Sequence, residues 1–282
     1  MGLSNTLFLP LAKKFIAGET LSDAIEVCRS RNSAGISGMI NILGEHTSDE
    51  EKIKSYVAEY LLILKQIKKE NIDSSISVKP SQLGIDLGLD YCKNNLIKLL
   101  TEASKHDNFV WVDMEDSPYT DDTISLFLDV KKEFSNMGLC VQAYLKRTED
   151  DLNQLLSANS HVRLCKGAYN ESDDVVYKKN KTVVNNFEIL IHNLFNQGTD
   201  FAIATHDDKL IDLSIKLHNS TNVPFEFQML LGVRDKKKSE LISQGHKVTE
   251  YIPYGKEWLP YSIRRLNERK RNIFLLARAF IP

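Results

Sequence analysis

The sequence alternates between short apolar segments and longer segments whose apolar residues recur every three or four positions. The short apolar segments are typical of strands, and the three- to four-residue spacing is typical of helices that bury one face. In segment 49–69, for example, Ile53, Tyr56, Val57 and Tyr60 follow the helical spacing. A chain that repeats strand and helix in this way is expected to build a parallel sheet covered by helices.

The alternation produces eight strand–helix units, which favour a closed (β/α)8 barrel over an open doubly wound sheet. The open sheet usually carries a glycine-rich first turn, and the sequence contains no G-x-G-x-x-G. The expected strands are residues 35–43, 75–79, 109–114, 139–144, 161–166, 201–205, 225–229 and 248–252. The expected helices are residues 8–31, 49–69, 86–104, 121–134, 149–156, 183–196, 208–218, 236–244 and 258–280.

Length and composition are those of one folded domain. The chain has 282 residues, of which 42% are hydrophobic and 26% charged, and this composition excludes a disordered chain. We expect residues 1–34 to form a helical segment that packs on a barrel formed by residues 35–282. The net charge of -2 argues against nucleic acid as a partner. No run of about 18 apolar residues occurs, so no transmembrane helix is expected.

The four cysteines, Cys28, Cys92, Cys140 and Cys165, are widely separated along the chain. They form no C-x-x-C pair, which disfavours a zinc site or a redox dithiol. We therefore expect free thiols in a reducing compartment such as the cytoplasm.

Polar residues gather where the expected strands end. In a (β/α)8 barrel the carboxyl ends of the strands share one rim, and binding and catalytic residues come from several of them. Each residue is ordinary by itself, but their common rim predicts a polar site. They are Lys79, Asp113, Glu115, Gln142, Arg163, Lys166, Thr205, His206, Gln228, Tyr251 and Tyr254.

The segment RLCKGAY at 163–169 is the most informative of these strand ends. Strand alternation places Arg163 and Cys165 on one face and Leu164 and Lys166 on the other. An inward Arg163 needs a counter-charge, which a carboxylate within the barrel or an anionic ligand would supply. The glycine that follows Lys166 either forms a plain turn or lets a ligand approach the backbone. The sequence alone does not decide which counter-charge Arg163 has, or which role the glycine has.

The expected last helix carries a second polar cluster. Tyr261, Arg264, Arg265 and Glu268 share one helix face because they are spaced three or four residues apart. This face is either solvated, with an arginine paired to Glu268, or it caps the barrel mouth. In the second case two guanidinium groups would bind a substrate carboxylate.

The run Thr205–Asp208 contains three residues that could ligate a metal, one histidine and two aspartates. Adjacent side chains of a strand point in opposite directions, however, and no second His or Glu lies at ligand spacing. Asp207 and Asp208 more simply cap the following helix. We expect no metal site.

These segments together resemble one known family, the proline dehydrogenases. The motifs are SVKPSQLG at 77–84, VDMED at 112–116, VQAYLKR at 141–147, RLCKGAY at 163–169, ATHDD at 204–208, FEFQMLLGV at 225–233 and EYIPYGKEWLPYSIRRLNER at 250–269. AGETLSDAI at 17–25 and NILGEH at 41–46 are similar to the start of the small members that have a single activity. The resemblance spans nearly the whole chain.

The resemblance implies a distorted (β/α)8 barrel of the TIM type that binds FAD and oxidises L-proline to Δ1-pyrroline-5-carboxylate. Electrons would pass to a quinone, commonly in a membrane, so the chain is expected in the cytoplasm with peripheral contact at the inner face of the membrane. A separate pyrroline-5-carboxylate dehydrogenase would oxidise the product.

The resemblance also implies roles for individual residues. Lys79, Asp113 and Arg163 would be the catalytic group, with Arg163 beside the reactive end of the flavin, where a cation stabilises negative charge on the reduced ring. The implied substrate contacts are Lys79, Leu164, Tyr251, Tyr261, Arg264 and Arg265. The implied FAD contacts are Asp113, Met114, Gln142, Arg163, Cys165, Lys166, Gly167, Ala168, Thr205, His206, Gln228, Arg265 and Glu268.

The sequence departs from the family pattern in three places. Met114 stands where many members have a small residue, and Cys165 stands where valine is common. Residues 177–186 match poorly the segment that contacts the adenosine end of FAD in longer members, so we assign no contact there.

Two other functions are compatible with a barrel. A barrel enzyme without flavin could form a Schiff base at Lys79 or Lys166. A barrel that binds or scaffolds without turnover would purify without colour, whereas a flavoprotein is yellow.

Overall fold

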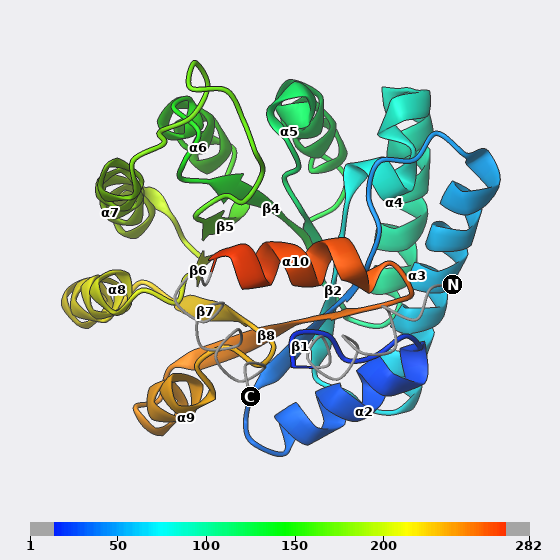
Figure 1. The fold of residues 1–282 in the computed structure, drawn as a ribbon, viewed down its shortest axis with the longest axis horizontal. Coiled ribbons are helices and arrows are strands. Elements are labelled where there is room, and N and C mark those ends of the chain that lie inside the picture. The colour runs from blue at the N-terminus through cyan, green and yellow to red at the C-terminus, as the bar shows by residue number, and fades with distance from the viewer. Residues whose placement is uncertain (1–13, 269–282) are drawn as a thin grey trace, which may run out of the picture.

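The structure is a computed structural model that describes residues 14–268, with side chains described as far as residue 263. Eight parallel strands form a closed barrel in the order β1 to β8 (Figure 1). Because β1 pairs with β8, with Ile40 opposite Ile252, no open sheet edge is left. The predicted barrel is confirmed. The strands are β1 Ser37–Ile42, β2 Ser74–Val78, β3 Val110–Val112, β4 Met137–Gln142, β5 His161–Cys165, β6 Phe201–Ala204, β7 Phe225–Leu230 and β8 Lys247–Tyr254.

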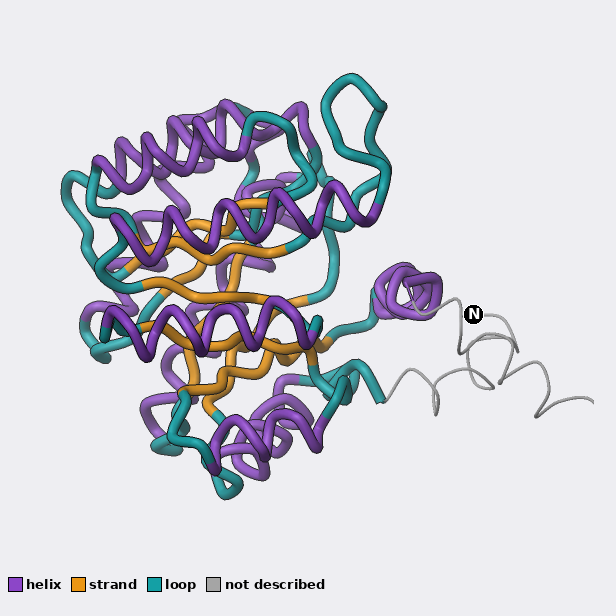
Figure 2. The backbone as a smooth tube through the Cα atoms, turned by 90° about the vertical axis from the view of Figure 1, so that its left-hand side faces the viewer, coloured by secondary structure: helices purple, strands orange, loops and turns teal. Residues whose placement is uncertain are grey.

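Helices surround the strands on the outside of the barrel (Figures 1 and 2). Their apolar faces meet the outer faces of the strands in one continuous core, in which Phe127, Phe187 and Tyr60 are fully buried. The α-helices are α2 Leu21–Asn32, α3 Glu50–Lys69, α4 Leu89–Ser104, α5 Thr120–Val130, α6 Thr148–Ser157, α7 Asn180–Gln197, α8 Asp208–Thr221, α9 Asp235–Ser243 and α10 Trp258–Glu268. The short 3₁₀ helices are η1 Pro80–Leu83, η2 Ile85–Leu87 and η3 Ser117–Tyr119.

The first described helix begins later than predicted. Residues 14–20 are not helical, and α2 starts at Leu21. Thr20 and Asp23 form a capping box, in which the Thr20 side chain accepts from the Asp23 backbone N–H and the Asp23 carboxylate accepts from the Thr20 N–H. This box satisfies the free amides at the start of α2 and so sets its first turn there. The expectation of a helix from residue 8 is therefore wrong over 14–20, and residues 8–13 lie outside the described residues.

Helix α10 crosses one end of the barrel and does not run alongside the strands (Figure 1). In the perpendicular view it lies beyond the ring of strands and helices (Figure 2). It follows the carboxyl end of β8, and Trp258 and Tyr261 on it are buried against Leu43 and Val233. Of the two positions that the sequence left open for this helix, the structure shows the one across the barrel mouth, although residues 269–280 of the predicted segment lie outside the described residues.

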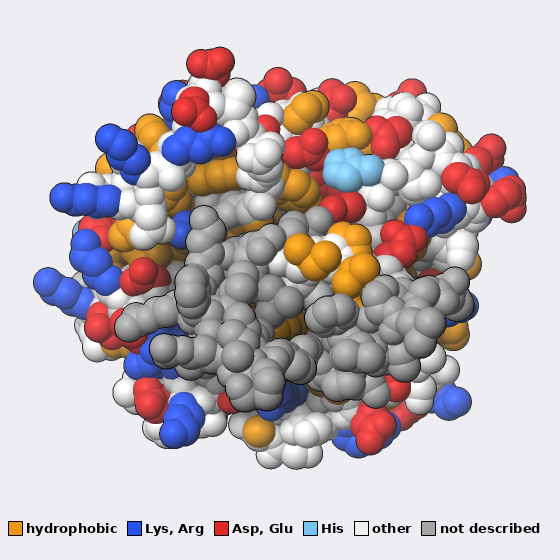
Figure 3. All heavy atoms as spheres, viewed as in Figure 1, with side chains coloured by type: hydrophobic (Ala, Val, Ile, Leu, Met, Phe, Trp, Pro, Cys, Tyr) orange, Lys and Arg blue, Asp and Glu red, His pale blue; other side chains and the backbone are white. Residues whose placement is uncertain are grey.

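The face that carries α10 mixes both signs of charge. Lys and Arg side chains alternate with Asp and Glu around its edge (Figure 3). Among the described residues, no helix is both long enough and apolar enough to cross a membrane.

Candidate active site

A cavity of about 540 Å³ opens at the carboxyl ends of the barrel strands, next to α10. Nearly every site residue that the sequence predicts within the described side chains lines it. Those residues are Lys79, Asp113, Met114, Gln142, Arg163, Cys165, Lys166, Gly167, Ala168, Thr205, His206, Gln228, Tyr251 and Tyr261. The convergence follows from parallel topology, because every strand ends at the same rim. The side chains of Arg264, Arg265 and Glu268 lie outside the described residues.

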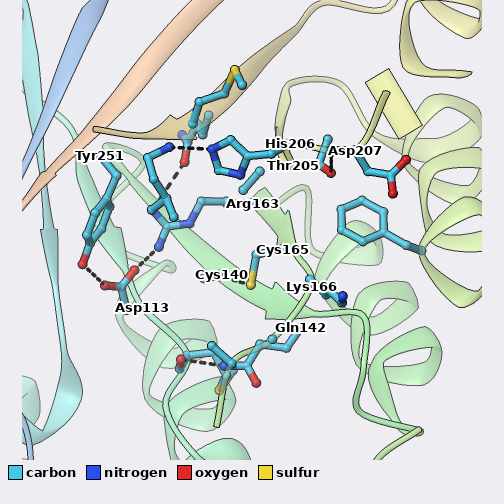
Figure 4. Close-up of a pocket in the computed structure, with 18 of the residues that line it drawn as sticks. Asp113, Cys140, Gln142, Arg163, Cys165, Lys166, Thr205, His206, Asp207 and Tyr251 are labelled. Carbon is cyan, nitrogen blue, oxygen red and sulfur yellow. Dashed lines mark hydrogen bonds and ion pairs between the residues drawn. The ribbon is translucent and has the colours of Figure 1, made fainter. Parts of the chain in front are cut away.

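Arg163 and Asp113 form an ion pair in the cavity (Figure 4). Arg163 is only 4% exposed. Asp113 also accepts hydrogen bonds from the Ser77 hydroxyl at 2.8 Å and the Tyr251 hydroxyl at 3.2 Å. Of the two counter-charges left open by the sequence, the structure supplies the carboxylate within the barrel. The guanidinium nevertheless still lines the cavity, so it can act on a bound ligand as well.

The electrostatics around Arg163 keep it charged. Burial acts to lower the pKa of Arg163, but the negative charge of the Cys140 sulfur when it is ionised and that of the Asp113 carboxylate raise it above its usual value. The guanidinium also lies 5.4 Å from the centre of the Trp111 ring. Burial raises the pKa of Tyr251 well above its usual value, so its hydroxyl remains a neutral donor to Asp113.

Gln142 presents a hydrogen-bond acceptor that has no partner among the described residues. Its Nε2 donates to the carbonyls of Met114 at 2.8 Å and Glu115 at 3.2 Å. Its Oε1 is buried and accepts nothing, yet the residue lines the cavity. An unsatisfied buried acceptor costs about 1–3 kcal/mol unless a donor reaches it. A ligand with N–H or O–H groups, such as a flavin ring, fits this position.

His206 links the loop after β6 to β7, and Asp207 lies at the start of α8. The backbone N–H of Leu230 donates to His206 Nε2 at 3.0 Å, so the ring proton of a neutral His206 lies on Nδ1. Asp207 caps α8 by accepting from the Lys209 N–H at 2.9 Å, as predicted. Asp208 does not cap; it pairs with Arg234 at 2.7 Å.

The two predicted lysines differ in environment. Lys79 is buried, and its Nζ lies 3.5 Å from Asn41 Oδ1. Lys166 is exposed at the rim, and its Nζ donates to Asn180 Oδ1 at 2.5 Å. Both lysines line the cavity, Lys79 as a buried side chain and Lys166 as an exposed one.

Gly167 is required by its own backbone and by a neighbouring ring. Its φ is 99°, a left-handed value that favours glycine. A Cβ on Gly167 would lie 2.1 Å from the Tyr144 ring. The sequence left open whether this glycine forms a plain turn or lets a ligand approach the backbone. In the structure, the group that leaves no room for a side chain at Gly167 is the Tyr144 ring.

One predicted pocket residue is placed elsewhere. Leu164 is fully buried in the core that the strands share with the helices, and it does not line the cavity. Strand alternation explains this position, because Arg163 and Cys165 on either side of it face the cavity. The role of Leu164 as a pocket wall is wrong.

The cavity has an apolar wall that the sequence did not predict. Val183, Val184 and Phe187 of α7 line it. Their helical spacing was visible in the sequence, but spacing alone does not distinguish residues facing the core from those facing a cavity.

The chain is similar to known proteins along most of its length. A family model described as "Proline dehydrogenase" matches residues 24–275. The chain belongs to the proline dehydrogenase family. Proline dehydrogenase 2 of Bacillus subtilis (strain 168) is 37% identical over 265 residues, which cover 93% of this chain and 88% of that protein. The proline dehydrogenase of Deinococcus radiodurans is 30% identical over 270 residues, covering 93% of this chain and 87% of that protein.

Among solved structures, the fold of this proline dehydrogenase family member is similar to that of proline utilization A from Bdellovibrio bacteriovorus. The TM-score is 0.87 at 22% identity, over 93% of this chain and 33% of that chain. This chain therefore spans about a third of that protein's length. The family predicted from the motifs is confirmed, and so is the predicted barrel fold.

Proposed function

We propose that this chain catalyses the FAD-dependent oxidation of L-proline to Δ1-pyrroline-5-carboxylate. Family membership supports the reaction. The observation that carries the cofactor assignment is the unpartnered Oε1 of Gln142, which is buried in the same cavity as the Arg163 guanidinium. The Gln142 oxygen can accept a hydrogen bond, and the Arg163 guanidinium can stabilise negative charge. A flavin ring carries an N–H donor and becomes negatively charged on reduction, so it suits both groups.

The residues that would hold the flavin are those that line the cavity and match the family motifs. We assign this role to Asp113, Met114, Gln142, Arg163, Cys165, Lys166, Gly167, Ala168, Thr205, His206 and Gln228. When bound, the flavin would supply the two-electron oxidation that no amino-acid side chain provides. Arg265 and Glu268 belong to the same proposal through the resemblance alone.

Substrate binding is assigned to the side of the cavity near α10. Tyr251 and Tyr261 line the cavity there and would pack against the proline ring, with the buried Lys79 as a further contact. Tyr251 is held in place by its hydrogen bond to Asp113. Arg264 and Arg265 would bind the substrate carboxylate, because α10 carries both positions across the barrel end. The tyrosines and Lys79 would exclude water from the reacting carbon.

The electron acceptor in this proposal is a quinone, and the contact with a membrane is peripheral. Leu259 and Ile263 lie one turn apart on α10 and are 37% and 46% exposed. They support a contact of α10 with an apolar surface. The product would pass to a separate pyrroline-5-carboxylate dehydrogenase.

An absorbance spectrum of the purified protein tests the proposal. We expect flavin bands that bleach when L-proline is added without oxygen. Flavin that bleaches with dithionite but not with L-proline would contradict the substrate. Protein that stays colourless after incubation with FAD would contradict the cofactor and favour a barrel without flavin chemistry.

We expect Gln142→Leu to weaken FAD binding roughly 2- to 13-fold, because one net hydrogen bond is worth about 0.5–1.5 kcal/mol. Fluorescence titration of the apoprotein with FAD measures the dissociation constant. Gln154→Leu on the exposed side of α6 is the matched control and should leave it unchanged. Gln142→Leu also removes the hydrogen bonds from Nε2 to the Met114 and Glu115 carbonyls. The thermal stability of the two apoproteins measures that loss separately from the loss of FAD affinity. Equal FAD affinity in Gln142→Leu and wild type would rule out the assigned contact.

A further inference from the structure

Two cysteines meet on the wall of the cavity. Cys140 on β4 and Cys165 at the end of β5 both line it, and their Sγ atoms are 3.4 Å apart (Figure 4). In the strand ladder Cys140 lies opposite Arg163, and Cys165 lies opposite Gln142. The thiols are thus diagonal neighbours on the same face of two adjacent strands. The two cysteines are 25 residues apart in the sequence, so the sequence alone did not predict this contact. The absence of a C-x-x-C motif had instead disfavoured a redox dithiol.

The surroundings favour a thiolate in this pair. The hydrogen bond between the sulfurs, which outweighs burial, and the Arg163 cation lower the pKa of Cys140 to about 7. The same sulfur contact raises the pKa of Cys165, so one proton is held between the two thiols. A thiolate beside a guanidinium in a cavity is the environment of a reactive cysteine.

The other two cysteines provide an internal comparison. Cys28 and Cys92 are fully buried in the core. Burial raises the pKa of Cys28 to about 12 and that of Cys92 further still. Both are expected to stay protonated and unreactive in the folded protein.

We propose that Cys140 and Cys165 form a peroxide-oxidisable thiol pair that closes into a disulfide across β4 and β5 on the cavity wall. This modification site goes beyond the proposed function and does not depend on it. The oxidant is a hydroperoxide, and the two electrons that reduce it come from the two thiols.

The chemistry takes two steps. The Cys140 thiolate attacks the terminal oxygen of the hydroperoxide, its O–O bond breaks, and Cys140 becomes a sulfenic acid while an alcohol or water leaves. The Cys165 sulfur then attacks the Cys140 sulfur, the S–OH bond breaks, and the hydroxide leaves as water with the Cys165 proton. Two thiols and one hydroperoxide thus give one disulfide, one alcohol or water, and one further water.

Closing the bond requires a small movement of the barrel rim. Diagonal residues of paired strands have α-carbons roughly 7–8 Å apart, which is beyond the roughly 6.8 Å that a disulfide usually spans without backbone movement. The sulfurs must approach from 3.4 Å to about 2.05 Å, which draws the ends of β4 and β5 together. We therefore expect a thiol reductant such as dithiothreitol to reopen the bond readily. Closure also removes a negative charge from beside Arg163.

Peptide mapping of the full chain, as purified, tests the proposal with hydrogen peroxide as the oxidant. After treatment, unfolding and alkylation, trypsin releases residues 133–146 with Cys140 and residues 164–166 with Cys165. We expect these peptides to be joined, lighter than their sum by two hydrogen atoms, and separated again by dithiothreitol. The pair should lose its thiols on the order of 100-fold faster than Cys28 and Cys92, given the difference in thiolate fraction and nucleophilicity.

Variants make the test specific. In Cys165→Ser, whose hydroxyl can still donate to the Cys140 sulfur, the reaction should stop at a Cys140 sulfenic acid that dimedone traps, with no joined peptide. Cys28→Ala is the control and should behave as wild type. If wild-type Cys140 and Cys165 remain alkylatable after peroxide, the proposal is overturned. It is also overturned if Cys140 sulfenic acid accumulates in the wild type without a joined peptide, or if Cys28 and Cys92 are oxidised at the same rate as the pair.

Discussion

Replacing Asp113 with alanine is expected to lower the free energy of unfolding by about 3–5 kcal/mol, because it leaves the buried Arg163 cation without its carboxylate. Arg163 is 4% exposed, so water does not replace the lost partner. The same change removes the acceptor of the Ser77 and Tyr251 hydroxyls. The Tyr251 side chain would then lose the hydrogen bond that fixes its hydroxyl in the cavity.

Urea titration of the apoprotein measures this loss without interference from a bound cofactor. Asp113→Asn should fall between wild type and Asp113→Ala, since the amide still accepts a hydrogen bond but carries no charge. Asp121→Ala is the matched control, because Asp121 also pairs with an arginine, Arg147, but its side chain is 82% exposed. Surface pairs contribute little, so this control should change stability only slightly. An Asp113→Ala midpoint equal to that of wild type would show that Arg163 does not depend on the carboxylate.

The barrel could be predicted because its determinants are local and repeated. Each strand and each helix carries its own periodicity, and eight repeats of the pair leave few topologies. Helix ends were less predictable. The helix expected from residue 8 did not take account of the capping box that Thr20 and Asp23 form. Apolar spacing continues through such a cap, whereas the backbone hydrogen bonds do not.

Most of the cavity lining could also be predicted, because parallel strands bring their carboxyl ends to one rim and the motifs at those ends resemble a known family. Three features could not. The position of Leu164 followed strand alternation and not the role implied by resemblance. The contact between Cys140 and Cys165 depends on the register of β4 against β5, which no single segment encodes. The reason for Gly167 depends on Tyr144, which lies on a different loop.

A second buried charge network supports the same cavity from behind. Lys238 of α9 is fully buried and donates to Glu250 of β8 and to the carbonyl of Leu230 at 2.9 Å. Glu250 also pairs with Arg31 of α2 at 2.8 Å. Leu230 lines the cavity and holds the His206 ring, and Glu250 precedes Tyr251 in β8. The network thus ties α2, α9 and β8 together directly behind residues that face the cavity.

We therefore expect Lys238→Met to cost about 3–5 kcal/mol of unfolding free energy at neutral pH, since it leaves the Glu250 carboxylate buried with Arg31 alone. Lys237→Met, one residue earlier on the same helix, removes only surface pairs with Asp208 and Glu240 and should change stability little. A loss in Lys238→Met no larger than that in Lys237→Met would contradict a structural role for the network.

The loss in Lys238→Met should also depend on pH. Burial already raises the pKa of Glu250 above its usual value, against the lowering effect of Lys238. Without Lys238 the pKa rises further, so the folded variant binds the Glu250 proton more tightly than the unfolded chain does. The stabilisation of the fold that comes from such a raised pKa is lost as the pH rises through the folded-state pKa, and it returns as the pH falls. Urea titrations from about pH 8 down to about pH 5 should therefore show the gap between Lys238→Met and wild type narrowing. A gap that stays constant or widens toward acid would mean that Glu250 is not the group left uncompensated, and that Lys238 acts through Leu230 or Asp235 instead.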